Sequence, residues 1–188
     1  MNNRIAVLIS GRGSNLVSLL NASKNNFFPG SINLVISDNE SAQGLSYAKE
    51  KGIRSEVANF SEFHNKKQFE FKLIDLISSE KINLICLAGF MRILSEEFIE
   101  SFSGNIVNIH PSLLPKYKGL NTHQRAIDAN EKYAGCTVHY VTKEVDKGKI
   151  IIQKSLLIKS CDTAESLSAR ILEIEHKIYP EALKKILS

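Results

Sequence analysis

The chain has 188 residues, of which 43% are hydrophobic and 23% are charged, and its formal net charge is +4. This length suits one domain with a single large core, and the composition excludes a disordered, collagen-like or coiled-coil chain. Lys and Arg are spread along the sequence. They form no arginine-rich arm or basic helix, so we expect no nucleic-acid partner.

Short β-rich runs alternate with longer segments of helical periodicity in the first part of the chain. Strands are predicted at Arg4–Ser10, Ile32–Ser37, Ile53–Ala58, Asn83–Ala88 and Asn105–Ile109, and helices at Asn15–Ser23, Ser41–Lys51 and Glu62–Ser79. Ser41 is expected to cap the second helix and Gly52 to end it. Because the strands are apolar on both faces, this order predicts an α/β fold with a Rossmann-like, mostly parallel sheet and helices on both faces.

The pattern changes after Pro115. Gly135–Thr142 and Lys149–Leu157 are predicted to form a hairpin, and a long terminal helix is predicted from Thr163 to Leu187, with Asp162 or Thr163 as its cap. The sequence contains no internal repeat and no linker-like segment. We therefore expect a single domain over residues 1–188.

Cysteine spacing and apolar runs bear on the cellular compartment. Cys86, Cys136 and Cys161 form no CxxC pair, so reduced thiols are expected and neither a disulfide framework nor a zinc knuckle. The apolar run Ile5–Ser10 is too short for a signal peptide, and Ile82–Met91 is about half the length of a membrane span. We expect a cytoplasmic protein without a membrane partner.

The segment Ser10–Asn15 joins the first strand to the first helix and contains two glycines. Glycines let the backbone approach a ligand, and a helix N-terminus offers unpaired N–H groups, so this turn suits a phosphate. It is not a Walker A loop, and Leu16 stands where a dinucleotide fingerprint needs its third glycine. A tight turn capped by Ser14 explains the segment equally well.

Asn108 and His110 lie two residues apart at the end of the fifth strand, so both side chains project from one face of the sheet. Pro111 ends that strand, which places His110 at the edge where open parallel sheets bind ligands. An amide beside an imidazole suits stabilisation of an oxyanion and movement of a proton. Asp146 is either a turn residue before Gly148 or a carboxylate that folds back to orient His110 and support its protonated form.

Other features point to chemistry less directly. Ala88–Leu94 leaves the fourth strand as an apolar patch with one Arg, which suits either a slot for a flat aromatic ligand or ordinary core packing. Glu175 and His176 lie in the terminal helix, on the surface or facing a cleft. The sequence has no HExxH, EF-hand loop or close cluster of metal ligands, so no metal is expected. Ser112 lacks the GxSxG context of a nucleophile, so a covalent mechanism is not expected.

Taken together, these motifs resemble the glycinamide ribonucleotide formyltransferase family, also called phosphoribosylglycinamide formyltransferase. The similarity covers nearly the whole chain and is strongest at Ser10–Asn15, Ala88–Ser95, Asn108–Tyr117, Gly135–Asp146 with Gly148, and Glu175-His176 with Tyr179-Pro180. The run from Asn108 to Pro115 is typical of the wider superfamily that uses formyltetrahydrofolate.

The resemblance implies transfer of a formyl group from 10-formyltetrahydrofolate to the amine of phosphoribosylglycinamide, by a monomer or homodimer. It implies a catalytic trio, a ribonucleotide site and a folate site. The trio is Asn108, His110 and Asp146; the ribonucleotide site is Gly13, Ser14, Asn15 and Glu175; the folate site is Phe90, Met91, Arg92, Ile93, Leu94 and Val141. Residues 1–107 would form the phosphate- and substrate-binding half, and residues 108–188 the catalytic and folate-loop half.

The sequence departs from the family pattern at Lys118, where Pro or Arg is familiar, and at Asn121, where many members carry His. The second departure affects fine tuning of the site. Many relatives continue beyond the terminal helix, and we expect that tail to be dispensable.

Four other functions compete with this one. A methionyl-tRNA formyltransferase would need a further C-terminal domain, and a formyltetrahydrofolate hydrolase a further N-terminal one. A non-catalytic phosphate-sensing module on the same scaffold would bind a ribonucleotide without turnover. For a nicotinamide-dependent oxidoreductase, Asp38 is the only candidate for the acidic residue at the end of the second strand.

Overall fold

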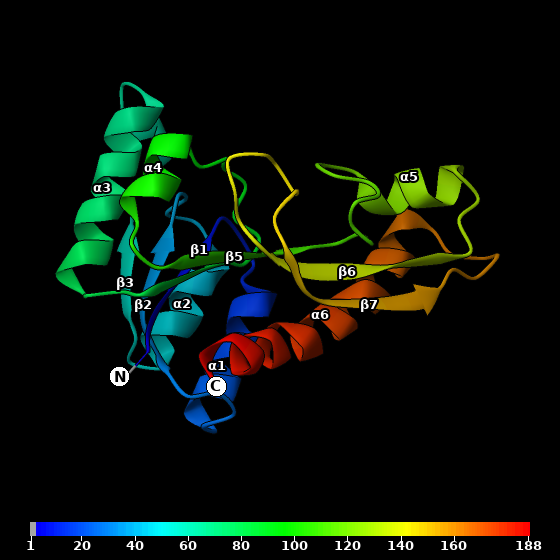
Figure 1. Ribbon diagram of the computed structural model, residues 1–188, viewed down its shortest axis with the longest axis horizontal. Coiled ribbons are helices and arrows are strands. Elements are labelled where there is room, and N and C mark those ends of the chain that lie inside the picture. Colours follow the sequence, from blue (N-terminus) through cyan, green and yellow to red (C-terminus); the bar gives the residue numbers. More distant parts are fainter. Residues whose placement is uncertain (1–2) are drawn as a thin grey trace.

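A computed structural model describes residues 3–188, and these form one seven-stranded sheet with the order β3-β2-β1-β4-β5-β6-β7. The strands are β1 (Arg4–Ile9), β2 (Ser31–Ser37), β3 (Arg54–Val57), β4 (Leu84–Leu87), β5 (Asn105–His110), β6 (Tyr133–Tyr140) and β7 (Ile150–Leu157). The first five strands are parallel, whereas β6 runs antiparallel to β5 and β7 antiparallel to β6. The predicted mostly parallel α/β sheet with a C-terminal hairpin is confirmed (Figure 1).

Helices cover both faces of this sheet (Figure 1). They are α1 (Ser14–Lys24), α2 (Gln43–Glu50), α3 (Lys66–Ser79), α4 (Glu96–Ser101), α5 (Thr122–Asp128) and α6 (Ala164–Leu187), with a short 3-10 helix, η1, at Phe60–Glu62. Side chains alternate along β1: Val7 and Ile9 pack against α1, α2 and α6, whereas Ala6 and Leu8 pack against α3. A strand that is apolar on both faces therefore serves two separate cores.

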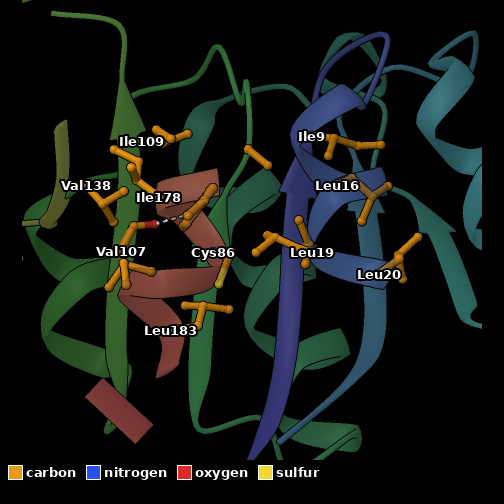
Figure 2. Close-up of a cluster of buried hydrophobic side chains, with 14 of the residues drawn as sticks. Ile9, Leu16, Leu19, Leu20, Cys86, Val107, Ile109, Val138, Ile178 and Leu183 are labelled. Atoms are coloured by element: carbon orange, nitrogen blue, oxygen red, sulfur yellow. Dashed lines mark hydrogen bonds between the residues drawn. The ribbon is translucent and has the colours of Figure 1, made fainter. Parts of the chain in front are cut away.

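Figure 2 shows the larger of these two cores. Leu16, Leu19 and Leu20 of α1 gather beside Ile9. On the other side of the view, side chains of β4, β5 and β6 meet α6; they are Cys86, Val107, Ile109, Val138, Ile178 and Leu183. Burial of these apolar side chains fixes the positions of β4, β5 and β6, and β5 carries Asn108 and His110 near its end.

The long helix α6 is fastened to its surroundings by polar contacts as well. Thr163 caps it, in a capping box with Ser166, which decides between the two predicted caps. Pro180 has no N–H for the carbonyl of His176 four residues earlier, and the hydroxyl of Ser18 in α1 donates to that carbonyl instead. The missing helix bond is thus replaced by a bond that ties α6 to α1.

Several predicted boundaries are wrong for local reasons. Helix α2 begins at Gln43 with Ala42 at its cap, not Ser41, and the N–H of Gly44 donates to the carbonyl of Gly11. The carbonyl of Gly11 thus accepts from an N–H in the first turn of α2, where a capping side chain usually accepts.

Helix α3 begins at Lys66 and not at Glu62, because the side chain of Asn65 caps it by accepting from the N–H of Gln68. Strand β6 begins two residues before the prediction, and α4 and α5 are not predicted from the sequence at all.

None of the helices formed by residues 3–188 combines the length and the apolar composition that a membrane crossing requires.

Candidate active site

A cleft of about 560 Å³ lies at the carboxyl ends of β4 and β5 and over β6. Its walls come mainly from three loops, at residues 89–94, 119–121 with the start of α5, and 141–146. In Figure 1 the last of these loops, drawn in yellow, rises from β6 beside α4. Ligands of open α/β sheets bind at this edge, so the position agrees with the general rule.

Strand periodicity places Asn108 and His110 on the cleft side of the sheet, because the alternate residues Val107 and Ile109 pack into the core beneath α6. Across the strand pair, Asn108 lies opposite His139 of β6. The Nδ2 atom of Asn108 is 3.3 Å from Nε2 of His139. The other ring nitrogen of His139 contacts the carbonyl of Tyr140 at 2.8 Å. Since a carbonyl only accepts, Nδ1 of His139 carries a hydrogen.

The loop after β6 brings Asp146 to both histidines. Its Oδ2 atom is 3.4 Å from Nδ1 of His110, and its Oδ1 atom is 3.6 Å from Nε2 of His139. The N–H of Gly119 donates to Oδ2 at 2.9 Å, which joins this loop to the neighbouring one. Asp146 has a left-handed backbone with φ of 52°, a conformation that Asp tolerates better than most residues.

The environment of Asp146 favours its ionised form. Burial alone would raise the pKa of this carboxyl, but the contact with His139, the N–H of Gly119 and the charge of His110 outweigh burial and lower the pKa. The structure thus provides a carboxylate beside two imidazoles, and one of them, His110, was expected from the sequence.

His110 is enclosed on both sides of its ring. Only 8% of its side chain is exposed, and its Nε2 atom contacts the carbonyl of Tyr117 at 2.9 Å. Each ring nitrogen therefore faces an acceptor: a carbonyl at Nε2 and a carboxylate at Nδ1. His123 lines the same cleft, and burial, followed by the charge of His110, lowers its pKa.

The glycine turn before α1 brings the backbone close to the start of α2. Gly13 has φ of 75°, and a Cβ at this position would lie 2.7 Å from Cα of Gly44. Helix α1 begins at Ser14 with Gly13, not Ser14, as its cap, so the first-turn N–H groups lack a side-chain partner. Asn15 lines the cleft, whereas Gly13 and Ser14 lie outside its lining.

Asn15 and Glu175 are joined across 160 positions of sequence by a buried hydrogen bond of 2.6 Å from Nδ2 to Oε2. Burial raises the pKa of Glu175, and the bond from Asn15 opposes that rise only in part. The Oδ1 atom of Asn15 is buried and has no partner within residues 3–188. A ligand that donates a hydrogen bond would satisfy it.

The residues predicted to hold the folate all line the cleft, but they differ in exposure. Phe90 and Leu94 are buried in the core beneath α3, which agrees with the alternative prediction that they pack in the core. Val141 packs against the same core. Met91 and Ile93 are 65% and 63% exposed, so they offer an apolar wall.

The side chain of Arg92 contacts Asp38 and Phe60. Its Nε atom is 2.7 Å from Oδ2 of Asp38, and its guanidinium lies 4.2 Å from the ring centre of Phe60. Asp38, the candidate acidic residue of a nicotinamide enzyme, is therefore paired with this cation.

No role was predicted for His139, Tyr117 or Gly119 from the sequence. His139 lay inside a predicted strand, but its neighbour across the sheet depends on register, which periodicity does not give. Asn121 has φ of 57° and lines the cleft, so an amide stands where many relatives were expected to have an imidazole. Within residues 3–188, no three His, Cys, Asp or Glu side chains are grouped so as to hold a metal ion.

Comparisons with known proteins agree on one family. A family model described as formyl transferase matches residues 3–183. The phosphoribosylglycinamide formyltransferase of Haemophilus influenzae is 44% identical over 181 residues, 96% of this chain and 85% of that protein. The crystal structure of phosphoribosylglycinamide formyltransferase from Brucella melitensis is 45% identical, with a TM-score of 0.95 over 100% of this chain and 97% of that one.

The human trifunctional purine biosynthetic protein adenosine-3 is 44% identical over 186 residues, 98% of this chain. The chain spans only 18% of the length of that relative.

Proposed function

The chain belongs to the phosphoribosylglycinamide formyltransferase family, and we propose that it transfers the formyl group of 10-formyltetrahydrofolate to the amine of 5'-phosphoribosylglycinamide. The products are 5'-phosphoribosyl-N-formylglycinamide and tetrahydrofolate, a step of purine biosynthesis. The observation that carries this proposal is one cleft in which Asn108, His110 and Asp146 meet between an apolar wall and the start of α1.

The apolar wall fits the folate. Met91 and Ile93 hold large apolar side chains mostly exposed to the cleft, and a flat ring system packed on them would remove that surface from water. Phe90, Leu94 and Val141 would support the wall from behind, and Arg92 would stay on Asp38 and contribute backbone groups. When bound, the folate supplies an electrophilic formyl carbon and departs as a stable amine.

The ribonucleotide would lie on the side of Asn15 and Glu175. The first turn of α1, with Gly13 and Ser14 at its start, offers N–H groups to the phosphate. The buried Oδ1 of Asn15 and the carboxyl of Glu175 would accept from the ribose and glycinamide groups. The two substrates would thus be held from opposite sides of the cleft, which replaces a bimolecular encounter by a positioned one.

Asn108 and His110 would act on the carbonyl oxygen of the formyl group. The side-chain amide of Asn108 lies 3.3 Å from Nε2 of His139 and has a hydrogen that can donate to this oxygen as negative charge builds on it. His110 can hold a proton at Nδ1, where the carboxylate of Asp146 balances its positive charge. His139 and Gly119 hold Asp146 in place.

An assay of donor consumption tests the proposal. Purified protein is mixed with 10-formylfolate, with and without phosphoribosylglycinamide, and the formylated product is identified by mass spectrometry. Loss of the donor only when the ribonucleotide is present supports the transferase. Loss without the ribonucleotide indicates a hydrolase, and binding of the ribonucleotide without turnover indicates a sensing module.

A matched pair of variants assigns the activity to the cleft. His110→Asn should abolish turnover, whereas His64→Asn, on the exposed surface before α3, should retain it. Equal activity in the two variants would contradict the proposed site.

The remaining parts of the proposal concern the whole protein. The three cysteines are unpaired, which favours a reducing, cytoplasmic location. A monomer or homodimer with small-molecule substrates stays the expected assembly. We keep the approximate division into a substrate-binding part over residues 1–107 and a catalytic and folate-loop part over residues 108–188, with Glu175 of the second part also directed to the ribonucleotide.

A further inference from the structure

Tyr117 has a backbone conformation that is unusual for an aromatic residue. Its φ angle is 53°, in the left-handed region that favours Gly and Asn. A residue stays in such a conformation only when its surroundings hold it there, and residues of this kind cluster at functional sites. Tyr117 lies directly beside the candidate active site, since its carbonyl contacts His110.

Side-chain contacts hold Tyr117 in this conformation. Its hydroxyl donates to Oε1 of Glu131 at 2.9 Å, and Nζ of Lys116 donates to the same oxygen at 2.6 Å. The guanidinium of Arg125 lies 5.3 Å from the centre of the Tyr117 ring. We call Tyr117, Glu131, Lys116 and Arg125 the tyrosine clamp.

The ionisation states within the tyrosine clamp favour these contacts. The bonds from Lys116 and Tyr117 lower the pKa of Glu131, so it remains an acceptor at neutral pH. Burial and the bond to Glu131 raise the pKa of Tyr117, so its hydroxyl remains a donor. Both ionisation states therefore favour the hydrogen bond between Tyr117 and Glu131 at neutral pH.

The tyrosine clamp determines where the carbonyl of Tyr117 points. That carbonyl is 2.9 Å from Nε2 of His110, and because it can only accept, Nε2 must carry a hydrogen. The contact between Nδ1 of His110 and Oδ2 of Asp146 is longer, at 3.4 Å. Loss of the hydrogen from Nε2 would leave two lone pairs facing each other at the shorter distance.

We propose that Tyr117 is a positioning residue for His110: the tyrosine clamp holds its carbonyl on Nε2, so that Nδ1, beside Asp146, is the nitrogen that takes a proton from the attacking amine and gives it to the departing folate nitrogen. This inference rests on the proposed transferase function for its kinetic consequence, but its structural part concerns only the tautomer of His110. In the neutral ring, the hydrogen stays on Nε2.

Several titratable groups face the site and would contribute to any pH profile. Asp146 contacts His110 directly, His139 contacts Asp146, and the charge of His110 affects His123. Because several ionisable groups contact one another here, the tautomer is better determined from the ring itself than from rates alone.

The experiment compares Tyr117→Phe and Glu131→Ala with Tyr47→Phe as the control. Tyr47 is 41% exposed on α2, and its hydroxyl has no hydrogen-bond partner within residues 3–188. Loss of one ordinary hydrogen bond from the tyrosine clamp should lower kcat by about tenfold, with a smaller change in KM. The control should match wild type.

The ring nitrogens of His110 are then observed by ¹⁵N NMR. The wild-type neutral ring should be protonated at Nε2, and both clamp variants should gain the tautomer protonated at Nδ1. A wild-type ring protonated at Nδ1, or clamp variants with the wild-type tautomer and wild-type kcat, would overturn the proposal. If Tyr117→Phe does not fold, Glu131→Ala decides the question alone.

The two proposals fail in different ways. An inactive wild-type protein whose His110 is protonated at Nε2 would contradict the transferase function and leave the positioning role intact. An active wild-type protein whose neutral His110 is protonated at Nδ1 would contradict the positioning role and leave the transferase function intact.

Discussion

Replacement of Asp146 by Asn isolates the effect of one negative charge. Asn tolerates the left-handed backbone of this position, and its side-chain oxygen can still accept from the N–H of Gly119. The loop should therefore keep its conformation. What is lost is the carboxylate 3.4 Å from Nδ1 of His110.

The size of the loss follows from that distance. Two unit charges 3.4 Å apart attract each other by about 5 kcal/mol at an effective dielectric constant of about 20, and by about half as much at about 40. Both side chains are less than 10% exposed, at 8% and 9%, so screening by water is limited. Positive charge that develops on His110 during the reaction loses this stabilisation, and we expect kcat to fall by about 10²- to 10⁴-fold.

The assay is steady-state turnover with both substrates saturating, after thermal unfolding has shown that the variant folds. Asp75→Asn, on the exposed side of α3, serves as the control for loss of a carboxylate elsewhere. A kcat for Asp146→Asn within about threefold of wild type, equivalent to about 0.7 kcal/mol, would refute the electrostatic reasoning.

Three further changes test other parts of the structure. Gly13→Ala should cost about 1–2 kcal/mol from the left-handed backbone alone and also push against Gly44, so the KM for the ribonucleotide should rise more than kcat falls. Glu175→Gln should raise Tm at pH 7. Burial raises the folded-state pKa of Glu175 above its unfolded value of 4.5, so the native state of the wild type loses stability as the pH rises above 4.5. The gain in Tm should vanish as the pH approaches 4.5, whereas ribonucleotide affinity should fall; an unchanged Tm at pH 7 would contradict this. Tyr179→Phe removes a hydroxyl that donates to two buried strand carbonyls and should lower the free energy of unfolding by about 1–3 kcal/mol in urea titrations, without a change in KM.

The sequence predicts the scaffold well because strong local patterns determine it. The strands β1, β2, β4 and β5 are apolar runs between turn residues, and Pro111 marks the end of β5 beside His110. The short helices α4 and α5, at Glu96–Ser101 and Thr122–Asp128, span fewer than eight residues each, which is too short for helical periodicity to stand out.

The site is predicted less completely because contacts between distant loops build it. The sequence left open whether Asp146 folds back onto His110, and that contact depends on a left-handed backbone and on the N–H of Gly119. The parts played by His139 and Tyr117 depend on strand register and on a backbone carbonyl. Neither is visible in residue types or spacing.

The hydrogen bond between Asn15 and Glu175 has a consequence for how the protein is made. The bond joins a residue of α1 to a residue of α6 that lies 160 positions later in the sequence, so α6 must dock on α1 before the two side chains meet. A growing chain that lacks α6 would present the glycine turn without its carboxyl partner. Affinity for the proposed ribonucleotide should therefore appear only once α6 has been made and has docked on α1.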